Sequence, residues 1–308
     1  MPSFLVTPVS SSQSLREVTA DEGDGGGLLG GGNKVVIIEV EGMLLNMKTG
    51  GFLQAPENDV SLFAQELKKA EKDPAVKAIV LRINSPGGTV SASDLMYNEV
   101  LRFKERSKKV VVASAQDIVA SGAYYVACSA DKIVVQPTSV IGSIGVIFNT
   151  FDISGTLDKI GARSNVIKSG PLKDMGSPFK AMDDNERAVM QAMVNEYYGL
   201  FKHIVQTNRK LDDTTLAAVT DGRVFTGSRS VELHLADQTG LLPDAIQVAK
   251  DLSHSPGAKV VLYKRPYGYS GSIYAHSQEE PPRANVNEFN LIAPRTFLPT
   301  GFYYLWNP

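Results

Sequence analysis

The sequence predicts an α/β domain whose strands run largely parallel. Between residues 34 and 263, runs of β-branched and apolar residues alternate with segments of helical periodicity, and the links between them are short. The run from Val76 to Ile83 is almost continuously apolar, as is typical of a strand buried on both faces of a parallel sheet. With 308 residues, 43% of them hydrophobic, the chain is long enough for one large α/β domain or two small ones.

Local signals place the expected elements in order. The predicted strands are short apolar runs at 35–40, 76–83, 110–113, 132–135 and 259–263. The first two predicted helices run from 59 to the Asp73-Pro74 pair and over 90–106. A long third helix starts at 183, a shorter fourth helix ends at 235, and a fifth covers 241–252. Asp183 followed by Glu186 forms a capping box at the start of the third helix. That helix has a wide apolar face, which indicates a core or subunit contact.

Two flanking segments differ in composition from this domain. Residues 1–33 are rich in Gly and Ser, and such a segment cannot bury enough apolar surface to offset its ordering entropy. We therefore expect residues 1–33 to be disordered and residues 34–263 to form the folded domain. Residues 264–308, rich in Pro, Gly, Tyr and Asn, are expected to be a C-terminal tail that lies on the surface or reaches a neighbour.

Composition restricts the partners and the compartment. The 31 basic and 33 acidic side chains give a net charge of −2, so there is no electrostatic case for binding nucleic acid or an anionic membrane. Cys128 is the single cysteine; it lies in an apolar run and is expected in the core. No run of about 18 apolar residues and no basic leader is present. A cytoplasmic or peripherally membrane-associated protein is expected.

A short stretch around Ser121 is a candidate catalytic turn. It follows the predicted strand at 110–113, and Ala120, Ser121, Gly122 and Ala123 are all small. Such residues suit a tight strand-to-helix turn, where the first amides of a helix have no intrahelical partner and could stabilise an oxyanion. The same composition also fits a helix of small residues that packs closely on a sheet.

A nucleophilic serine needs a base, and the histidines are poorly placed to supply one. None of the four histidines lies between Ser121 and Lys202. Lys168 and Lys173 fall in a loop of Gly, Pro and Ser residues. A lysine acts as a base only when it is neutral, which requires burial, whereas a lysine in a polar loop is usually a solvated charge.

Four motifs occurring in a fixed order resemble a known family. They are Ser85-Pro-Gly-Gly88, Val119-Ala-Ser-Gly-Ala-Tyr-Tyr125, Ile141-Gly-Ser-Ile-Gly-Val146 and Lys168-Ser-Gly-Pro-Leu-Lys-Asp174. Each motif alone is weak, but the four in this order closely resemble the signal peptide peptidase A family of serine proteases, peptidase family S49, in its short single-repeat form. The resemblance covers residues 34–263, which would then be the catalytic domain. It implies a ClpP/crotonase-like superhelix of ββα units with an added helical region.

The resemblance also implies a role for each motif residue. Ser121 matches the nucleophile and Lys173 the general base of a Ser–Lys dyad. Ser143 matches a hydroxyl that orients the lysine. The backbone amides of Gly88 and Gly122 would form the oxyanion hole. Neither a cofactor nor a metal is implied.

The implied function is a serine endopeptidase that degrades cleaved signal peptides or other apolar peptides. Short members assemble into homo-oligomeric rings with sites shared between subunits, and a partner could supply membrane association. One alternative is a catalytically silent scaffold of the same fold. Another is a crotonase-type acyl-CoA enzyme, which would normally want a carboxylate base near the turn, where only Asp117 is available. Fold alone does not separate these three functions.

Overall fold

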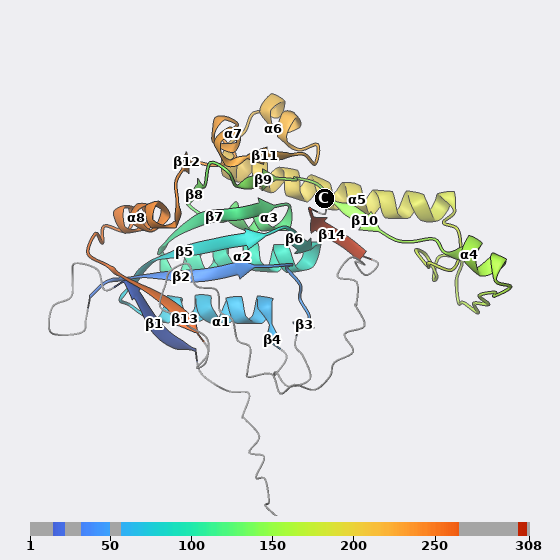
Figure 1. The fold of residues 1–308 in the computed structure, drawn as a ribbon, viewed down its shortest axis with the longest axis horizontal. Coiled ribbons are helices and arrows are strands. Elements are labelled where there is room, and N and C mark those ends of the chain that lie inside the picture. Colours follow the sequence, from blue (N-terminus) through green and yellow to red (C-terminus); the bar gives the residue numbers. More distant parts are fainter. Residues whose placement is uncertain (1–14, 22–31, 50–56, 265–300, 307–308) are drawn as a thin grey trace, which may run out of the picture.

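A computed structural model describes residues 15–21, 32–49, 57–264 and 301–306, and it has the predicted α/β architecture (Figure 1). The strands of the main sheet are β1 (Arg16–Asp21), β2 (Lys34–Glu41), β5 (Val76–Ser85), β7 (Val110–Ala120), β8 (Lys132–Val135), β9 (Val140–Gly142), β11 (Val224–Thr226), β12 (Gln238–Thr239) and β13 (Lys259–Lys264). Their order is β1-β13-β2-β5-β7-β8-β12, with β9 paired to β7 and β11 paired to β9.

The centre of this sheet is parallel, as predicted. β2, β5, β7 and β8 are joined by parallel ladders, and β13 pairs parallel with β2. Side chains alternate along β2, so that Val36 and Ile38 lie in one hydrophobic cluster and Val35 and Ile37 in another. Both faces of the central strands are therefore buried, which explains the unbroken apolar run in β5.

Helices cover both faces. They are α1 (Asp59–Lys72), α2 (Val90–Ser107), α3 (Gly122–Ala127), α4 (Ser154–Lys159), α5 (Asp184–Arg209), α6 (Asp213–Val219), α7 (Gly227–Glu232) and α8 (Leu242–Leu252). Buried residues of α1, α2, α3 and α5 belong to the larger cluster, whereas those of α8 belong to the cluster on the other face. No helix among the described residues is both long and apolar enough to cross a bilayer.

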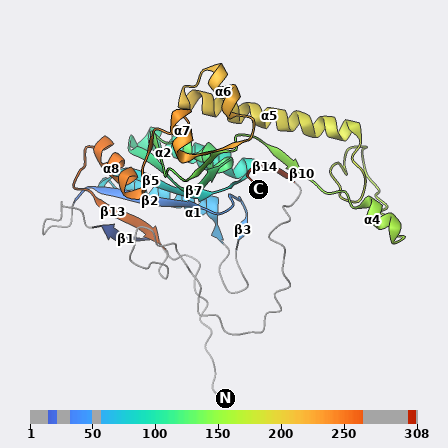
Figure 2. The ribbon, with the colours of Figure 1, turned by 45° about the horizontal axis from the view of Figure 1, so that its top comes forward.

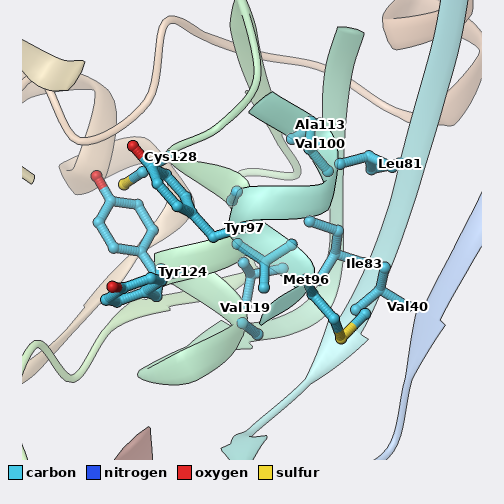
Figure 3. Packing of buried hydrophobic residues seen from close by; sticks show 14 of the residues in the cluster. Val40, Leu81, Ile83, Met96, Tyr97, Val100, Ala113, Val119, Tyr124 and Cys128 are labelled. Carbon is cyan, nitrogen blue, oxygen red and sulfur yellow. The ribbon is translucent and has the colours of Figure 1, made fainter. Parts of the chain in front are cut away.

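The larger cluster contains the single cysteine. Figure 3 shows Met96 of α2 beside Val40 and Ile83 of the sheet, with Tyr124 and Cys128 farther along the same core. Cys128 is 1% exposed, and burial raises the pKa of its thiol to about 12. A thiol with such a pKa is almost entirely protonated at neutral pH, so the prediction that Cys128 is a core residue is confirmed.

A second, smaller sheet lies at the end of the main one. It consists of β10 (Ile147–Asn149), β14 (Gly301–Leu305) and β6 (Gly87–Thr89), in that order, while β3 (Lys48–Thr49) and β4 (Glu57–Asn58) form a separate hairpin. β6 follows β5 directly, so the small sheet is attached at the carboxyl ends of the parallel strands. This edge is where ligands bind in open α/β sheets.

The helical region extends beyond the sheets. α5 has the predicted capping box, because the Asp183 side chain accepts from the Glu186 amide at 2.8 Å and the Glu186 side chain accepts from the Asp183 amide. The segment 150–183, which includes α4, projects from the body of the molecule and returns at the start of α5 (Figures 1 and 2). We call residues 150–183 the arm.

Two expectations about the flanking segments need correction. Residues 1–33 are not disordered throughout, because Arg16–Asp21 forms β1 and pairs antiparallel with β13. Within the C-terminal tail, Gly301–Leu305 forms β14 between β6 and β10. Both strands join partners far away in the sequence, so their local patterns gave no indication of the pairing. The domain boundaries at 33 and 263 stay predictions.

Asp237 ties the end of α5 to the edge of the main sheet. Its carboxylate accepts from the Ile133 amide at 2.8 Å and from the Arg209 guanidinium at 3.0 Å. Burial by itself raises the pKa of this carboxyl, but the bond from the Ile133 amide and the charge of Arg209 outweigh it and hold the pKa below its ordinary value. Asp237 therefore contributes more to stability when it is ionised.

The replacement Asp237→Asn should lower the free energy of unfolding at pH 7 by about 1–3 kcal/mol, because Arg209 then loses its charged partner. The wild-type contribution is complete above the unfolded pKa of about 3.9 and is lost as the pH falls through the lower folded pKa. The two proteins should thus converge in stability on acidification, which urea unfolding at a series of pH values measures. Asp158→Asn, at an exposed carboxylate of α4, is the control. A stability gap that stays constant down to pH 2.5 would contradict the assignment.

Candidate active site

Ser121 lies in a strained turn between β7 and α3, as the sequence predicts. Its φ of 53° and ψ of −119° are rare for a residue with a side chain. The Ser121 amide donates to the carbonyl of Gly142 at 2.7 Å, and its carbonyl accepts from the Tyr125 amide at 3.0 Å. Ser121 is 1% exposed. Strain of this kind persists only where the surroundings impose it, and it is concentrated at functional sites.

Gly87 and Gly88, the glycine pair before α2, lie in close contact with the backbone of Leu44. The Leu44 amide donates to the Gly87 carbonyl and the Thr89 amide donates to the Leu44 carbonyl, both at 2.9 Å. A Cβ at Gly88 would lie 1.9 Å from the Leu44 carbonyl oxygen, and Gly87 has a φ of +98°. Both positions therefore require glycine.

The structure brings together the amides of Gly88 and Gly122. A Cβ at Gly122 would lie 3.2 Å from the Gly88 nitrogen, and a Cβ at Gly87 would lie 2.7 Å from the Gly122 nitrogen. Gly122 directly follows Ser121 in the chain. Two backbone amides that lie close together, one of them directly after a serine, can stabilise the oxyanion of a tetrahedral intermediate.

Ser143 lies close to the same turn, directly after the neighbouring strand β9. β9 pairs parallel with the end of β7, with Ala120 opposite Gly142, and Ser143 follows Gly142. Its φ is 49°, and its amide donates to the Arg223 carbonyl at 2.8 Å. The predicted lysine-orienting hydroxyl thus belongs to the same end of the sheet as Ser121.

Lys173 is not part of this cluster within one chain. It lies on the arm, it is exposed, and its amide donates to the Gly170 carbonyl at 3.2 Å. The neighbouring Lys168 is paired with Asp174 at 2.7 Å. Figures 1 and 2 agree that the arm extends away from the main sheet, and Figure 1 shows α3 beside that sheet. The structure therefore brings together Ser121, Ser143, Gly88 and Gly122, but not Lys173.

Sequence reasoning missed the strand that covers this cluster. β14 pairs with β6 along the glycine pair, and Tyr304 is fully buried against Tyr125 and Phe201. A signal was present in the five aromatic or aliphatic residues from Phe302 to Trp306, which are typical of a strand. The sequence of the tail did not indicate which strand it would pair with, since Gly88 lies more than 200 residues earlier.

The replacement Gly122→Ala should destabilise the protein by about 1–3 kcal/mol, because the added Cβ would lie 2.2 Å from Ser93 Oγ and 3.0 Å from the Tyr304 carbonyl oxygen. Adding Ser93→Ala should recover part of this loss. Gly199→Ala is the matched control: it places the same methyl group in open space on α5, where alanine favours the helix by up to about 1 kcal/mol. The measurement is urea unfolding, and equal effects at both glycines would refute the close packing at Gly122.

Comparisons with known proteins identify relatives of this chain. Residues 103–255 match the family model of peptidase family S49. The chain is 32% identical over 253 residues to a protein of Enterococcus faecium named signal peptide peptidase SppA, covering 82% of this chain and 72% of that protein. It is 31% identical over 238 residues to the chloroplastic serine protease SPPA of Arabidopsis thaliana, covering 76% of this chain and 35% of that longer protein.

Other similarities are more partial. Protease 4 of Salmonella typhi is 34% identical over 190 residues, covering 62% of this chain and 30% of that protein. Among solved structures, a variant of the 1510-N membrane-bound stomatin-specific protease aligns with a TM-score of 0.45 and 13% identity, over 71% of this chain and 85% of that chain. On the relatives' identity and coverage, this chain belongs to peptidase family S49, and its α/β fold is the ClpP/crotonase-like fold of that family.

Proposed function

We propose that the protein is a serine endopeptidase in which Ser121 is the nucleophile and Lys173 of a neighbouring subunit is the general base. The observation that carries this proposal is the strained turn at Ser121 with the amides of Gly88 and Gly122 beside it. Ser121 combines burial and a rare backbone conformation with proximity to two backbone amides, which is the combination expected of a catalytic nucleophile. Membership of a peptidase family supports the same conclusion.

The proposed reaction is acyl transfer. Ser121 Oγ attacks the carbonyl carbon of a peptide bond while its proton passes to neutral Lys173. The resulting oxyanion accepts hydrogen bonds from the Gly88 and Gly122 amides. When the carbon–nitrogen bond breaks, the lysine gives its proton to the leaving amine. The lysine then takes a proton from a water molecule, which attacks the carbonyl carbon of the acyl ester. When the ester bond breaks, the lysine gives that proton to Ser121 Oγ, so that the acid product leaves and the serine and the neutral lysine are restored.

Exposed apolar side chains on the arm support a site shared between subunits. Phe151, Ile160, Val166, Ile167 and Phe179 are all at least 43% exposed, and Ile167 is completely so. Such a concentration on a projecting segment marks a protein contact. A lysine carried into that contact would leave bulk water, and desolvation favours the neutral form that a base requires. We infer a homo-oligomeric ring in which each arm completes the site of the next subunit.

The proposed substrates are cleaved signal peptides or other apolar peptides. The support comes from the name of the Enterococcus relative and from the apolar and aromatic residues around Ser121. An extended peptide would bind beside β6, whose amides would pair with the peptide backbone.

Subunit mixing tests the shared site. Ser121→Ala and Lys173→Ala should each reduce hydrolysis of a fluorogenic apolar peptide by about a thousandfold or more. When the two inactive variants are dissociated, mixed and reassembled, about a quarter of the sites should hold both intact residues if subunits combine at random, and activity should return in that proportion. Lys173→Ala mixed with the double variant Ser121→Ala/Lys173→Ala is the control and should stay inactive.

Two results would overturn this proposal. If the mixture stays inactive although its subunits exchange, each site is built from a single chain. If the wild type neither hydrolyses the peptide nor reacts with a fluorophosphonate while it is folded and oligomeric, the silent scaffold of the same fold is the better description.

A further inference from the structure

The loop of the arm that carries Lys173 is held by ion pairs around one carboxylate. An oxygen of Asp174 lies 2.7 Å from Lys168 Nζ and 3.0 Å from Lys180 Nζ. Lys180 also pairs with Glu186, in the first turn of α5. Two lysines and two carboxylates therefore alternate along a continuous chain whose four charges sum to zero. We call these four residues the ion-pair chain.

The ion-pair chain is fixed at its α5 end. Glu186 is 0% exposed, and its amide donates to the Asp183 carboxylate at 2.8 Å in the capping box. A buried carboxylate is costly unless it is paired, so Glu186 holds Lys180 in place. Lys180 in turn fixes the position of the Asp174 carboxylate.

The other end of the ion-pair chain closes the loop. Lys168 Nζ donates to the Pro171 carbonyl at 2.9 Å as well as binding Asp174. The Lys173 amide donates to the Gly170 carbonyl at 3.2 Å. The backbone on both sides of Lys173 is therefore tied to the same few residues.

Both central members of the ion-pair chain keep their charge at neutral pH. The hydrogen bond from Lys168, followed by that from Lys180, lowers the pKa of the Asp174 carboxyl to about 2. The bond to Glu186, followed by that to Asp174, raises the pKa of Lys180 above its ordinary value. Asp174 is therefore a full negative charge that both lysines share, at any pH at which a lysine base would work.

Lys173 is left out of this arrangement. It is exposed, and among the residues that the structure describes its side chain has neither an ion pair nor a hydrogen bond. Asp174 is the next residue, with its Cα about 3.8 Å away, and a lysine side chain is long and flexible. A carboxylate paired with Lys173 would favour the ammonium form, whereas a general base must be neutral. Lys168 and Lys180 already bind the carboxylate that could do this.

We propose that Lys168 and Lys180 are positioning residues that keep the Asp174 carboxylate from pairing with Lys173, so that Lys173 reaches the neighbouring site without a counterion. The proposal rests on the proposed function, in which Lys173 is the general base. The two ammonium groups act in the same direction, since nearby positive charge disfavours a third one. Glu186 anchors the arrangement to α5.

Other charged groups stay the same when Lys180 is changed. Asp183 caps α5, and Asp152 accepts from the amide and hydroxyl of Ser154. Within the described structure none of these groups is bonded to Lys173. The remaining charged side chains of the arm, of the first turn of α5 and of the end of β7 before Ser121 are all exposed: Asp158, Lys159, Arg163, Asp184, Arg187 and Asp117.

The pKa of Lys173 can be measured without catalysis in the full chain carrying Ser121→Ala. The rate at which acetic anhydride acetylates Lys173, followed by mass spectrometry from about pH 7 to 11, reports the neutral fraction of the amine. Lys180→Gln should raise this pKa by about 0.5–1 unit, because Asp174 becomes available as a counterion. Adding Asp174→Asn should return the pKa to the Ser121→Ala value or below it.

Three further variants serve as controls. Lys180→Arg keeps the positive charge and should leave the pKa of Lys173 nearly unchanged. Lys159→Gln removes the same charge from an exposed position of α4 and should also have little effect. Lys168→Gln combined with Lys180→Gln should give a larger shift than Lys180→Gln alone. Circular dichroism confirms that each variant is folded.

The pH profile of hydrolysis gives the second measurement, in chains that keep Ser121. The acidic limb of kcat/KM reports the pKa of the base in the free enzyme, so Lys180→Gln should move that limb to higher pH by the same 0.5–1 unit, approximately. Activity on the acidic side should fall about three- to tenfold, and the plateau at high pH should be kept. Asp174→Asn in the same chain should move the limb back. A merely structural role would lower the plateau and would not be reversed in this way.

The outcomes separate this proposal from the proposed function. An unchanged pKa of Lys173 in Lys180→Gln, or a shift that persists after Asp174→Asn, overturns the role of the ion-pair chain. Hydrolysis whose pH profile is the same in the wild type and in Lys180→Gln overturns it too and leaves the peptidase function standing. A reversible pKa shift without hydrolysis by any chain overturns the peptidase function and leaves the arrangement around Asp174 standing.

Discussion

The hydrogen bond from the Ser121 amide to the Gly142 carbonyl is the contact on which the site depends. It continues the pairing of β7 with β9 one residue beyond the end of β7, and it holds Ser121 in a backbone conformation that a free chain would leave. The bond from the Tyr125 amide fixes the other side of the turn. The register between β7 and β9 thereby sets the direction in which the Ser121 side chain leaves the backbone.

The surrounding close packing depends on residues with no side chain. Gly87, Gly88 and Gly122 allow three backbone segments, those of β6, α3 and Leu44, to approach within distances that one methyl group would prevent. The parallel sheet behind them is buried on both faces, so the segments are attached to a rigid support. A rigid support of this kind keeps backbone amides oriented before negative charge develops on a reacting oxygen. Amides oriented in advance lower the activation barrier, because they need no reorganisation during the reaction.

Much of the fold and part of the site could be predicted from the sequence because their signals are local. The capping box of α5, the apolar run of β5 and the small residues around Ser121 each reveal their structure within a few residues. The pairings of β1 and β14 could not be predicted, because each of these strands is ordered by the edge of a distant strand. The site residues from Gly88 to Ser143 come together because β5, β7 and β9 are neighbours in one sheet. Lys173 belongs to the arm, which extends away from the body of the molecule, so the single chain does not bring it close to Ser121.

The length of α5 sets a limit on what one chain can position. The helix has 26 residues, so it is about 39 Å long, and a tilt of 5° at one end moves the other by about 3 Å. Its carboxyl end is anchored, since Arg209 donates to the His234 carbonyl and pairs with Asp237. Its amino end carries the arm. A small rotation of α5 about its anchored carboxyl end therefore moves the arm by a distance similar to the reach of proton transfer, which requires heavy atoms within about 3 Å of each other. In the proposed assembly, the neighbouring subunit that receives the arm would have to place Lys173 within that distance of Ser121.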